Sequence, residues 1–318
     1  MADQKESNSV NDLINNISNI NISDSQKQNI KLEQKPEINI DDLSNLVENI
    51  NITYDKDIDK DKKEIIDKFI KDVKNKQIDT SKSNKKHDGA EGHWLEKQMG
   101  LKPNGKNEPD MNGYEMKKEN NKITFGDYAA SEYIFTEKKP TIIQKNKWEN
   151  TSVKMTINEF IKIFGTCKEA KNRYSWSGSC VPTYDTWNDC GQKLIVNENN
   201  DICIYYSYSK DKREVKNTFP EYLKHDDILI VIWLKEKLSK NINNKFNKKG
   251  FFICKKNSKN TCFNEICFGP PLCYELFIDN IKKKNIIFDS GMVTGNSRKY
   301  SHFRGSGKFW NSLITEKY

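Results

Sequence analysis

The stretch PDMNGYEMKK, residues 109–118, places two carboxylates and a lysine beside a proline and a glycine. Glu115 and Lys117 are two residues apart, so on a strand both side chains would lie on one face. Asp110 would face the opposite side of a continuous strand, but Asn112 and Gly113 favour a turn there. The pattern therefore predicts that Asp110 meets Glu115 across this turn, although an ordinary solvated hairpin can carry the same residues.

Two converging carboxylates with an ammonium beside them suit the cutting of a phosphodiester. Hard carboxylate oxygens favour Mg²⁺, which takes few protein ligands and fills its other positions with water and phosphate oxygens. Such a cation polarises a phosphodiester and lowers the pKa of a bound water molecule. Lys117 could hold or activate that water and offset the charge of the transition state. The stretch thus predicts a Mg²⁺ site and leaves open whether it takes one ion or two.

The residues before this stretch extend the pattern. Residues 91–103 are expected to form a short helix, and Glu96 lies on it ahead of Asp110. Taken together, GHWLEKQMGLKPNGKNEPDMNGYEMKK resembles the MvaI/BcnI-like type II restriction endonucleases, members of the PD-(D/E)xK superfamily that are related to the mismatch-repair nickase MutH. The family pattern is a Gly, then Leu-Glu on a helix, Leu-Gly, Asp, four residues and Glu-x-Lys. It is met here by Gly92, Leu95, Glu96, Asp110, Glu115 and Lys117, with Met99 where Leu is usual.

This resemblance implies a fold, a chemistry and a set of roles. It implies an α/β fold with a mixed central sheet flanked by helices. Asp110 and Glu115 carry over as metal ligands, Lys117 as the catalytic lysine, and Glu96 as a helix carboxylate that supports the metal site. The substrate is expected to be double-stranded DNA, cut one strand after the other by a monomer. A companion DNA methyltransferase would protect the host genome, and the chain itself shows no methyltransferase motif.

A second stretch, residues 288–314, resembles the segment with which that family reads DNA bases. It reads FDSGMVTGNSRKYSHFRGSGKFWNSLI and interleaves basic residues with aromatic residues and glycines. Arg and His can donate to the major-groove edge of guanine, so His302 and Arg304 are predicted to read bases. Lys299 and Lys308 are predicted to contact phosphates, and Arg298 belongs to the same DNA-binding set. A basic surface loop without base contacts remains the alternative.

Composition divides the chain near residue 86. Residues 1–86 hold 15 Lys and Arg against 17 Asp and Glu, so the rest of the chain carries a net charge of +10. They contain no Gly, Cys or Trp, and their only aromatic residues are Tyr54 and Phe69. We therefore expect residues 1–86 to be a disordered or weakly helical arm, with one short helix around Ile66, Phe69 and Val73. Residues 87–318 are expected to form one basic domain, and nucleic acid is the common partner of such a domain.

The start of the chain is polar and shows no secretory signal. The longest apolar run, Ile228–Leu234, is far shorter than the ~20 residues of a membrane helix. We therefore expect an intracellular protein that is neither secreted nor embedded in a membrane. The eight cysteines form no C-x-x-C pair, so small buried side chains are favoured over a zinc site.

Further elements are expected along the domain. Strands are predicted around residues 113–118, 122–128, 226–235 and 249–256, and a hairpin with an Asn-rich turn over residues 192–209. Helices are predicted around residues 156–165 and 271–284, with a last short helix from Phe309. The middle of the domain, including residues 175–192, does not align with the family pattern. Two functions besides a sequence-specific endonuclease stay open: a strand-nicking repair nuclease of the MutH kind, and a catalytically silent DNA-binding module.

Overall fold

The structure, a computed structural model, describes residues 60–81, 89–102, 106–135, 155–168, 172–259 and 261–318. The chain divides into two compact units, Met1–Lys56 and Asp57–Tyr318. The first unit lies outside the described residues, as do the predictions made for it. Within the described part, no helix is both long and apolar enough to cross a membrane.

The candidate site is built on a four-stranded sheet, which we call the main sheet. Its strands run in the order β1 (Glu115–Lys118), β9 (Phe251–Lys256), β10 (Phe263–Gly269) and β14 (Glu316–Lys317). β1 and β9 are parallel, with Glu115 opposite Phe251, whereas β9, β10 and β14 are antiparallel. The mixed central sheet that the resemblance implies is therefore present.

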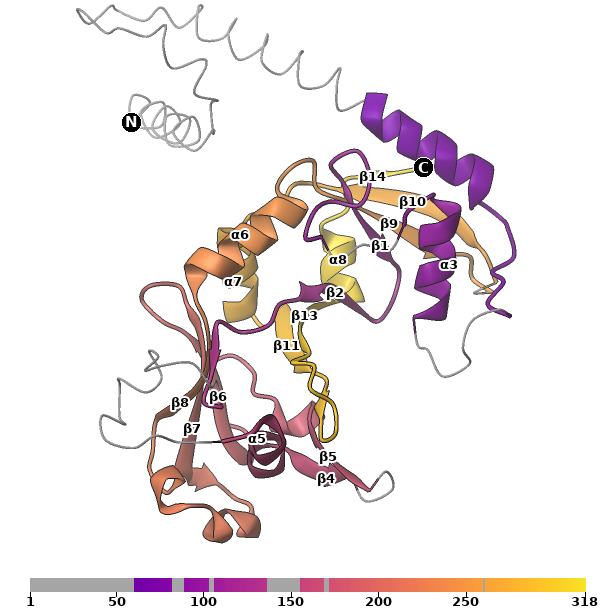
Figure 1. The fold of residues 1–318 in the computed structure, drawn as a ribbon. Coiled ribbons are helices and arrows are strands. Elements are labelled where there is room, and N and C mark those ends of the chain that lie inside the picture. Colours follow the sequence, from indigo (N-terminus) through magenta and orange to yellow (C-terminus); the bar gives the residue numbers. More distant parts are fainter. Residues whose placement is uncertain (1–59, 82–88, 103–105, 136–154, 169–171, 260) are drawn as a thin grey trace, which may run out of the picture. The chain divides into compact units, whose positions relative to one another are not determined.

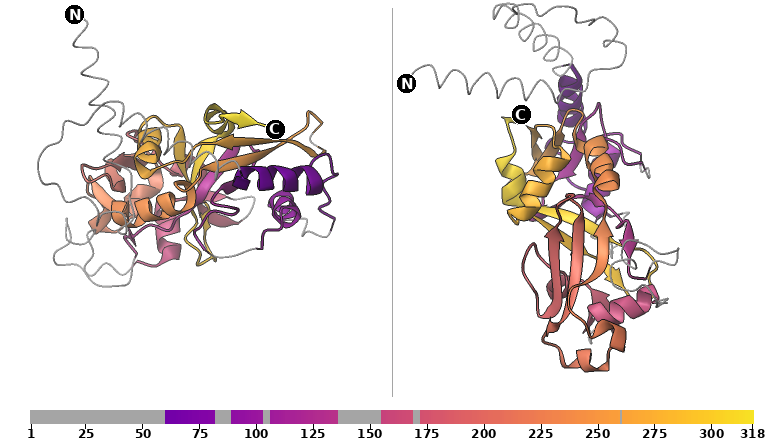
Figure 2. Two further views of the ribbon diagram at one scale, coloured as in Figure 1. Left: turned by 90° about the horizontal axis from the view of Figure 1, so that it is seen from above. Right: turned by 90° about the vertical axis from the view of Figure 1, so that its left-hand side faces the viewer.

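Two helices cover one face of the main sheet. They are the helix of residues 60–72 and α3 (Ala90–Gln98), and Figure 2 (left) shows both on the same side of the strands. Ile65 and Phe69 of the first helix, and Val73 just after it, are fully buried with Leu95 of α3 and with side chains of β9 and β10. Their spacing of four residues forms one apolar helical stripe. Ile70, next to this stripe, is instead 52% exposed.

The domain boundary expected near residue 86 is corrected by this packing. The compact unit begins at Asp57, and Phe69 is buried in a cluster that contains side chains of the main sheet. Beyond the helix, the backbone N–H of Asn75 donates to the Phe263 carbonyl at 2.7 Å, and Gln77 bridges to Cys262. Residues 60–81 are therefore part of the domain rather than of the arm.

Two helices pack on the opposite face of the main sheet, α6 (Lys235–Phe246) and α8 (Gly307–Ser312), and α7 (Tyr274–Lys282) packs against α6 and the strand β11 (Ile286–Ser290) (Figure 1). Phe246 and Trp310 are fully buried there, and the Trp310 ring meets the Phe251 ring edge-on at 4.8 Å. The Trp310 indole N–H donates to the Ile123 carbonyl at 3.1 Å, which satisfies its polar atom. Trp310 is therefore a core residue with its polar atom satisfied.

The segment between β1 and β9 forms most of the remaining sheets (Figure 1). The first of these sheets has the strand order β11, β13 (Ser301–Ser306) and β2 (Lys122–Asp127). The second has the order β12 (Met292–Val293), β5 (Arg173–Trp176) and β4 (Thr166–Lys168). The third has the order β3 (Glu132–Tyr133), β8 (Ile228–Trp233), β7 (Ile202–Asp211) and β6 (Cys190–Val196). β1 and β2 are thus consecutive strands of different sheets. The α5 helix (Ile157–Phe164) packs against β5, and short 3-10 turns lie at Gly178–Cys180, Glu214–Thr218 and Glu221–Leu223.

Residues 175–192, which do not align with the family pattern, contribute to the core of this segment. The Gln192 side chain accepts from the Trp176 indole N–H and donates to the Phe164 carbonyl, both at 2.8 Å. Its burial is therefore matched by hydrogen bonds. Among the cysteines, Cys180, Cys190, Cys203, Cys254 and Cys267 are buried, Cys262 and Cys273 are half-buried, and Cys167 is exposed.

Candidate active site

The turn between Asp110 and β1 is set by local sequence. Asn112 and Gly113 both have positive φ, at 47° and 85°, the backbone conformation that Asn and Gly tolerate best. Met111 and Tyr114 close the turn, with N–H···O distances of 3.0 Å and 2.8 Å. The chain therefore reverses direction between Asp110 and Glu115, as the sequence predicts.

Asp110 lies against the start of β1. Its Oδ2 accepts the backbone N–H of Met116 at 3.0 Å. Asp110 is exposed to solvent at its surface, yet the surrounding protein removes enough water, and Glu115 lies close enough, to raise the pKa of Asp110 to about 6. The nearby charges of Lys117 and Lys245 oppose this rise but do not cancel it.

Glu115 and Lys117 lie on the face of β1 that points toward α6. The Lys117 ammonium donates to Glu115 Oε1 at 2.7 Å and lies 5.3 Å from the centre of the Phe246 ring. Both side chains are buried, with 2% of Glu115 and 8% of Lys117 exposed. Burial lowers the pKa of Lys117, against the opposing effect of the Glu115 charge. The structure therefore brings Asp110, Glu115 and Lys117 into one cluster.

A second lysine, which the sequence analysis did not identify, reaches the same cluster. Lys245, in the last turn of α6, places its ammonium 3.1 Å from Glu115 Oε1. A signal for this helix was present in the sequence, since Leu238, Ile242 and Phe246 recur at the four-residue spacing of an apolar helical face. That spacing predicts the helix but does not predict which strand it meets.

The cluster has the donor set of a hard divalent cation. Glu115 Oε2 is buried and has no hydrogen-bond partner among the described residues, an arrangement that is costly unless a ligand completes it. No group of three or more His, Cys, Asp or Glu side chains gathers in the described ranges. Two carboxylates are nevertheless enough for Mg²⁺, which keeps several waters and phosphate oxygens. Asp110 and Glu115 therefore fit the cation that the sequence predicts.

Glu96 is not seen to contact the other three predicted residues. It is half-buried on α3, and its side chain makes no hydrogen bond or ion pair with described residues. The acid of α3 that reaches β1 is Glu91, which pairs with Lys118 and with Lys256, each at 2.7 Å. Because Lys118 and Lys117 alternate along β1, this contact lies on the other face of the main sheet from Lys117.

The two predicted base readers lie on one face of β13. Ser301, Phe303 and Gly305 are buried, whereas the alternate residues His302 and Arg304 are half-buried. The His302 ring stacks on Tyr300 with centroids 5.8 Å apart, and the Arg304 Nε lies 3.2 Å from Asp289. Burial lowers the pKa of His302, which favours the neutral ring at neutral pH. β13 pairs with β2, the strand that follows β1, so this face is joined to the cluster by a short link.

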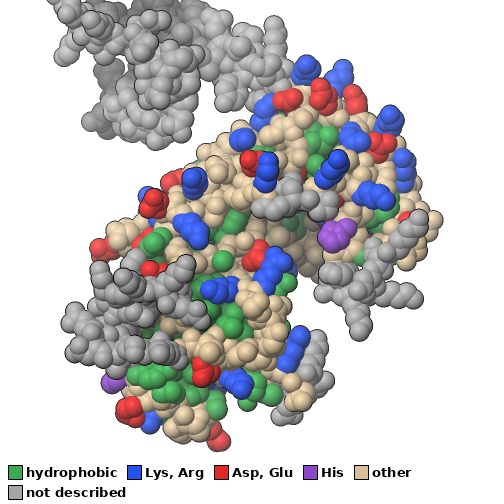
Figure 3. Space-filling view, in the orientation of Figure 1, with side chains coloured by type: hydrophobic (Ala, Val, Ile, Leu, Met, Phe, Trp, Pro, Cys, Tyr) green, Lys and Arg blue, Asp and Glu red, His purple; other side chains and the backbone are tan. Residues whose placement is uncertain are grey.

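The other predicted DNA contacts are dispersed. Arg298 pairs with Asp127 at 3.0 Å and lies over the Tyr300 ring, whereas the Lys299 ammonium lies over the rings of Tyr133 and Phe135. Lys308 is exposed and lines a polar hollow of about 880 Å³ with Lys118 and Lys256. Figure 3 shows Lys and Arg side chains spread over one face of the described unit, with Asp and Glu side chains among them.

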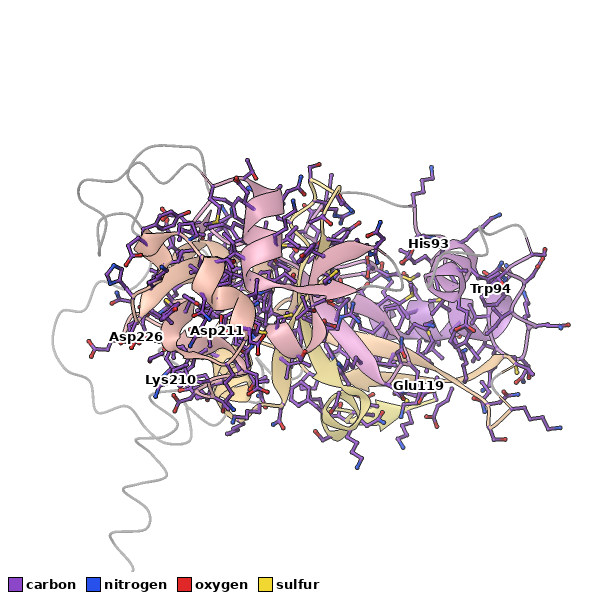
Figure 4. All side chains as sticks on the ribbon, turned by 90° about the horizontal axis from the view of Figure 1, so that it is seen from below. His93, Trp94, Glu119, Lys210, Asp211 and Asp226 are labelled. Atoms are coloured by element: carbon purple, nitrogen blue, oxygen red, sulfur yellow. The ribbon has the colours of Figure 1, made fainter. Side chains whose placement is uncertain are left out.

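Other polar and aromatic residues have structural roles. Asp226 accepts from the backbone and the hydroxyl of Ser209, at 2.8 Å and 2.7 Å, so it ties the segment before β8 to β7. His93 is exposed on α3 beside Trp94, far from Asp226 and Asp211 (Figure 4). Trp94 stacks on Phe263 with centroids 6.1 Å apart, so it packs α3 against β10.

Comparison with known proteins identifies the family. The LlaMI restriction endonuclease family matches residues 70–318. The type II restriction enzyme ScrFI of Lactococcus lactis subsp. cremoris is 41% identical over 273 residues, which span 80% of this chain and 97% of that enzyme. Among solved structures, the complex of restriction endonuclease MvaI with its cognate DNA substrate superimposes with a TM-score of 0.48 at 12% identity, covering 74% of this chain and 89% of that one. MvaI in the absence of DNA gives a TM-score of 0.37 at 11% identity, covering 72% and 85%. The family match and the identity to ScrFI confirm the resemblance to type II restriction endonucleases, and the chain belongs to the LlaMI restriction endonuclease family.

Proposed function

We propose that this chain is a sequence-specific endonuclease of double-stranded DNA that hydrolyses phosphodiester bonds with Mg²⁺. The observation that carries the proposal is the cluster of Asp110, Glu115 and Lys117 at β1, in which Glu115 Oε2 is buried without a partner. Membership in a family of restriction endonucleases gives this cluster its substrate class.

Each residue of the cluster has a role that its position supports. Asp110 and Glu115 would hold the cation, and bound Mg²⁺ would supply the Lewis acid for the phosphate and the attacking water. Lys117 is held by Glu115 and by the Phe246 ring, so its ammonium is in position before negative charge develops on the phosphate. Burial of the Lys117 ammonium strengthens that interaction because little water screens it. Glu96 is assigned its supporting role by the family resemblance alone.

DNA recognition is assigned to the exposed face of β13. His302 and Arg304 lie on that face and present donors suited to base edges in a major groove. Arg298, Lys299 and Lys308 would contact phosphates, and Lys308 is the clearest of the three because it is exposed and makes no ion pair among the described residues.

The mode of action follows from the presence of one such cluster in the described residues. A monomer with one cluster would cut one strand, reorient, and then cut the other. A partner methyltransferase would protect the cell's own copies of the recognition site, and the enzyme would act inside the cell, where its DNA substrate lies.

A supercoiled plasmid of known sequence tests the proposal. Incubation with Mg²⁺ should give discrete linear fragments, preceded by open circles, and EDTA should abolish both. Open circles that never become linear would favour a strand-nicking nuclease of the MutH kind. A plasmid that is bound but unchanged would favour a silent DNA-binding module, and cleavage in EDTA would exclude the proposed metal site.

A further inference from the structure

Glu115 Oε1 has two ammonium partners, and this is the feature from which a new role can be inferred. Lys117 donates to it at 2.7 Å from within β1, and the Lys245 ammonium lies 3.1 Å from it at the end of α6. The other oxygen of the same carboxylate, Oε2, is buried and bare. Oε1 thus has two ammonium partners, whereas Oε2 has none and could bind a ligand.

The position of Lys245 is fixed by the helix that carries it. Leu238, Ile242 and Phe246 bury one face of α6, and the backbone N–H of Tyr274 donates to Asn243 Oδ1 at 2.9 Å. Asn107, in the segment that leads to Asp110, donates its side-chain amide to the Asn241 carbonyl at 2.7 Å. The helix is therefore tied both to α7 and to the approach to Asp110, so Lys245 is presented from a rigid element.

The link from α6 to β9 keeps this helix end beside Glu115. Gly250 has a φ of 99°, and a Cβ there would lie 2.3 Å from the Gly269 carbonyl oxygen. Its own carbonyl accepts the backbone N–H of Glu115 at 3.0 Å. A close backbone approach that only glycine permits thus sets the end of α6 against the start of β1.

We propose that Lys245 is a positioning residue of the cleavage reaction, which holds Glu115 Oε1 so that Oε2 points to the cation and Lys117 is free to turn to the scissile phosphate. This inference rests on the proposed function, because it assigns a role within the same cluster. The Lys117 ammonium has three N–H donors, and its hydrogen bond to Glu115 uses one of them. Because Lys245 also holds Glu115 Oε1, the carboxylate can stay in place while Lys117 shifts toward the phosphate. Phe246, the next residue, packs beside Lys117 and accompanies Lys245 on the same helix turn.

The test uses the full chain and four variants. Lys245→Met removes the ammonium and keeps the length of the side chain, and Lys245→Arg keeps the charge. Lys240→Met is the matched control, because Lys240 lies on the same helix and is exposed. Lys117→Met tests the cluster itself. For each protein we would measure the single-turnover cleavage rate at saturating Mg²⁺, the affinity for cognate DNA in Ca²⁺, and the midpoint of thermal unfolding.

We expect Lys245→Met to cut at least about tenfold more slowly, with DNA affinity changed less than about twofold. Lys245→Arg should recover most of the rate because it can restore the ion pair, and Lys240→Met should behave as the wild type. A loss of turnover without a loss of binding is the effect expected of a residue that acts on the reacting groups.

Three results would overturn the inference. An unchanged rate in Lys245→Met, with Lys117→Met inactive, would exclude Lys245 from the reaction. A loss confined to DNA affinity, with a weaker salt dependence, would make Lys245 a phosphate contact. A slow, less stable Lys245→Met that Lys245→Arg fails to restore would indicate a packing role. Cleavage at the normal rate by Lys117→Met would instead contradict the proposed function, so the two failures are distinguishable.

Discussion

The backbone N–H of Met116 donates to Asp110 Oδ2 at 3.0 Å, across the turn that separates Asp110 from β1. This hydrogen bond holds Asp110 beside Glu115, whose charge makes the Asp110 carboxyl more costly to ionise. A cation that binds both would relieve this repulsion. The same repulsion between the two carboxylates therefore destabilises the cation-free cluster and favours the binding of a cation.

Asp110→Asn should stabilise the cation-free protein at about pH 8 and abolish cleavage. The pKa of Asp110 is raised from 3.8 to about 6 in the folded state. Its contribution to stability is therefore complete below its ordinary pKa and is lost as the pH rises through about 6. Asparagine can still accept the Met116 N–H and never acquires the charge. Thermal unfolding in EDTA should show a higher midpoint for the variant at about pH 8 and a smaller difference at about pH 5. A variant that is less stable at about pH 8 would show that the charge is already balanced.

Mg²⁺ or Mn²⁺ should stabilise the wild type, whereas Glu115→Gln should lose most of this effect. Glu115 Oε2 is buried without a partner, and a cation that binds only the folded state raises its stability by mass action. Unfolding midpoints measured along a Mg²⁺ titration check this. Glu265→Gln, which changes a carboxylate on β10 away from the cluster, is the control. Equal stabilisation of the wild type and Glu115→Gln would place the cation elsewhere.

Phe69→Ala should destabilise the domain by about 3–5 kcal/mol, the usual cost of emptying a buried aromatic site. Phe69 is fully buried against the main sheet, whereas its neighbour Ile70 is 52% exposed. Ile70→Ala should therefore change stability by less than about 0.5 kcal/mol. Denaturant unfolding of both variants measures the difference. Similar small effects for both would mean that the helix of residues 60–72 is not docked in solution.

The same packing sets where the chain can be shortened. A chain that begins at Asp57 should fold and cut DNA, because no residue of the cluster lies before it. A chain that begins at Ser83 loses Ile65, Phe69 and Val73 and should be unstable or aggregated, because the face of the main sheet that they cover becomes exposed. Full activity and unchanged stability in the shorter chain would restore the boundary expected from composition.

Much of the local structure can be predicted from neighbouring residues. The turn at Asn112 and Gly113 follows from residues that accept positive φ. The start of α5 follows from Thr156 and Glu159, which form a capping box. The β6–β7 hairpin follows from two apolar runs around an Asn-rich turn. In each case the interacting groups lie within a few residues of one another.

What could not be predicted depends on pairing between distant segments. Lys245 reaches Glu115 because β9 pairs with β1 in parallel, and no local pattern in α6 contains that information. The apolar stripe around Phe69 is visible in the sequence, but its partner face is formed by β9 and β10. Composition therefore placed the boundary too late, since polar flanks outweighed one amphipathic helix.

His302→Ala or Arg304→Ala should each lose about 1–3 kcal/mol of discrimination at one base pair, the usual value of a base-edge contact. Lys308→Ala should instead weaken binding to all sequences alike and reduce the salt dependence, because an exposed lysine contributes through phosphate. Cleavage rates on cognate and single-mismatch duplexes at several salt concentrations separate these effects. An unchanged base preference in both His302→Ala and Arg304→Ala would show that recognition does not depend on β13.

The most direct test of the central claim is end-sequencing of a genome digested with Mg²⁺ by the wild type and by Lys117→Ala. The wild type should give fragments whose ends share one short sequence. Lys117→Ala should give no fragments while still binding the same DNA tightly in a gel-shift assay, because the lysine serves the transition state more than the bound state. The same fragments from Lys117→Ala at a similar rate would show that the cluster at β1 is not the site of cleavage.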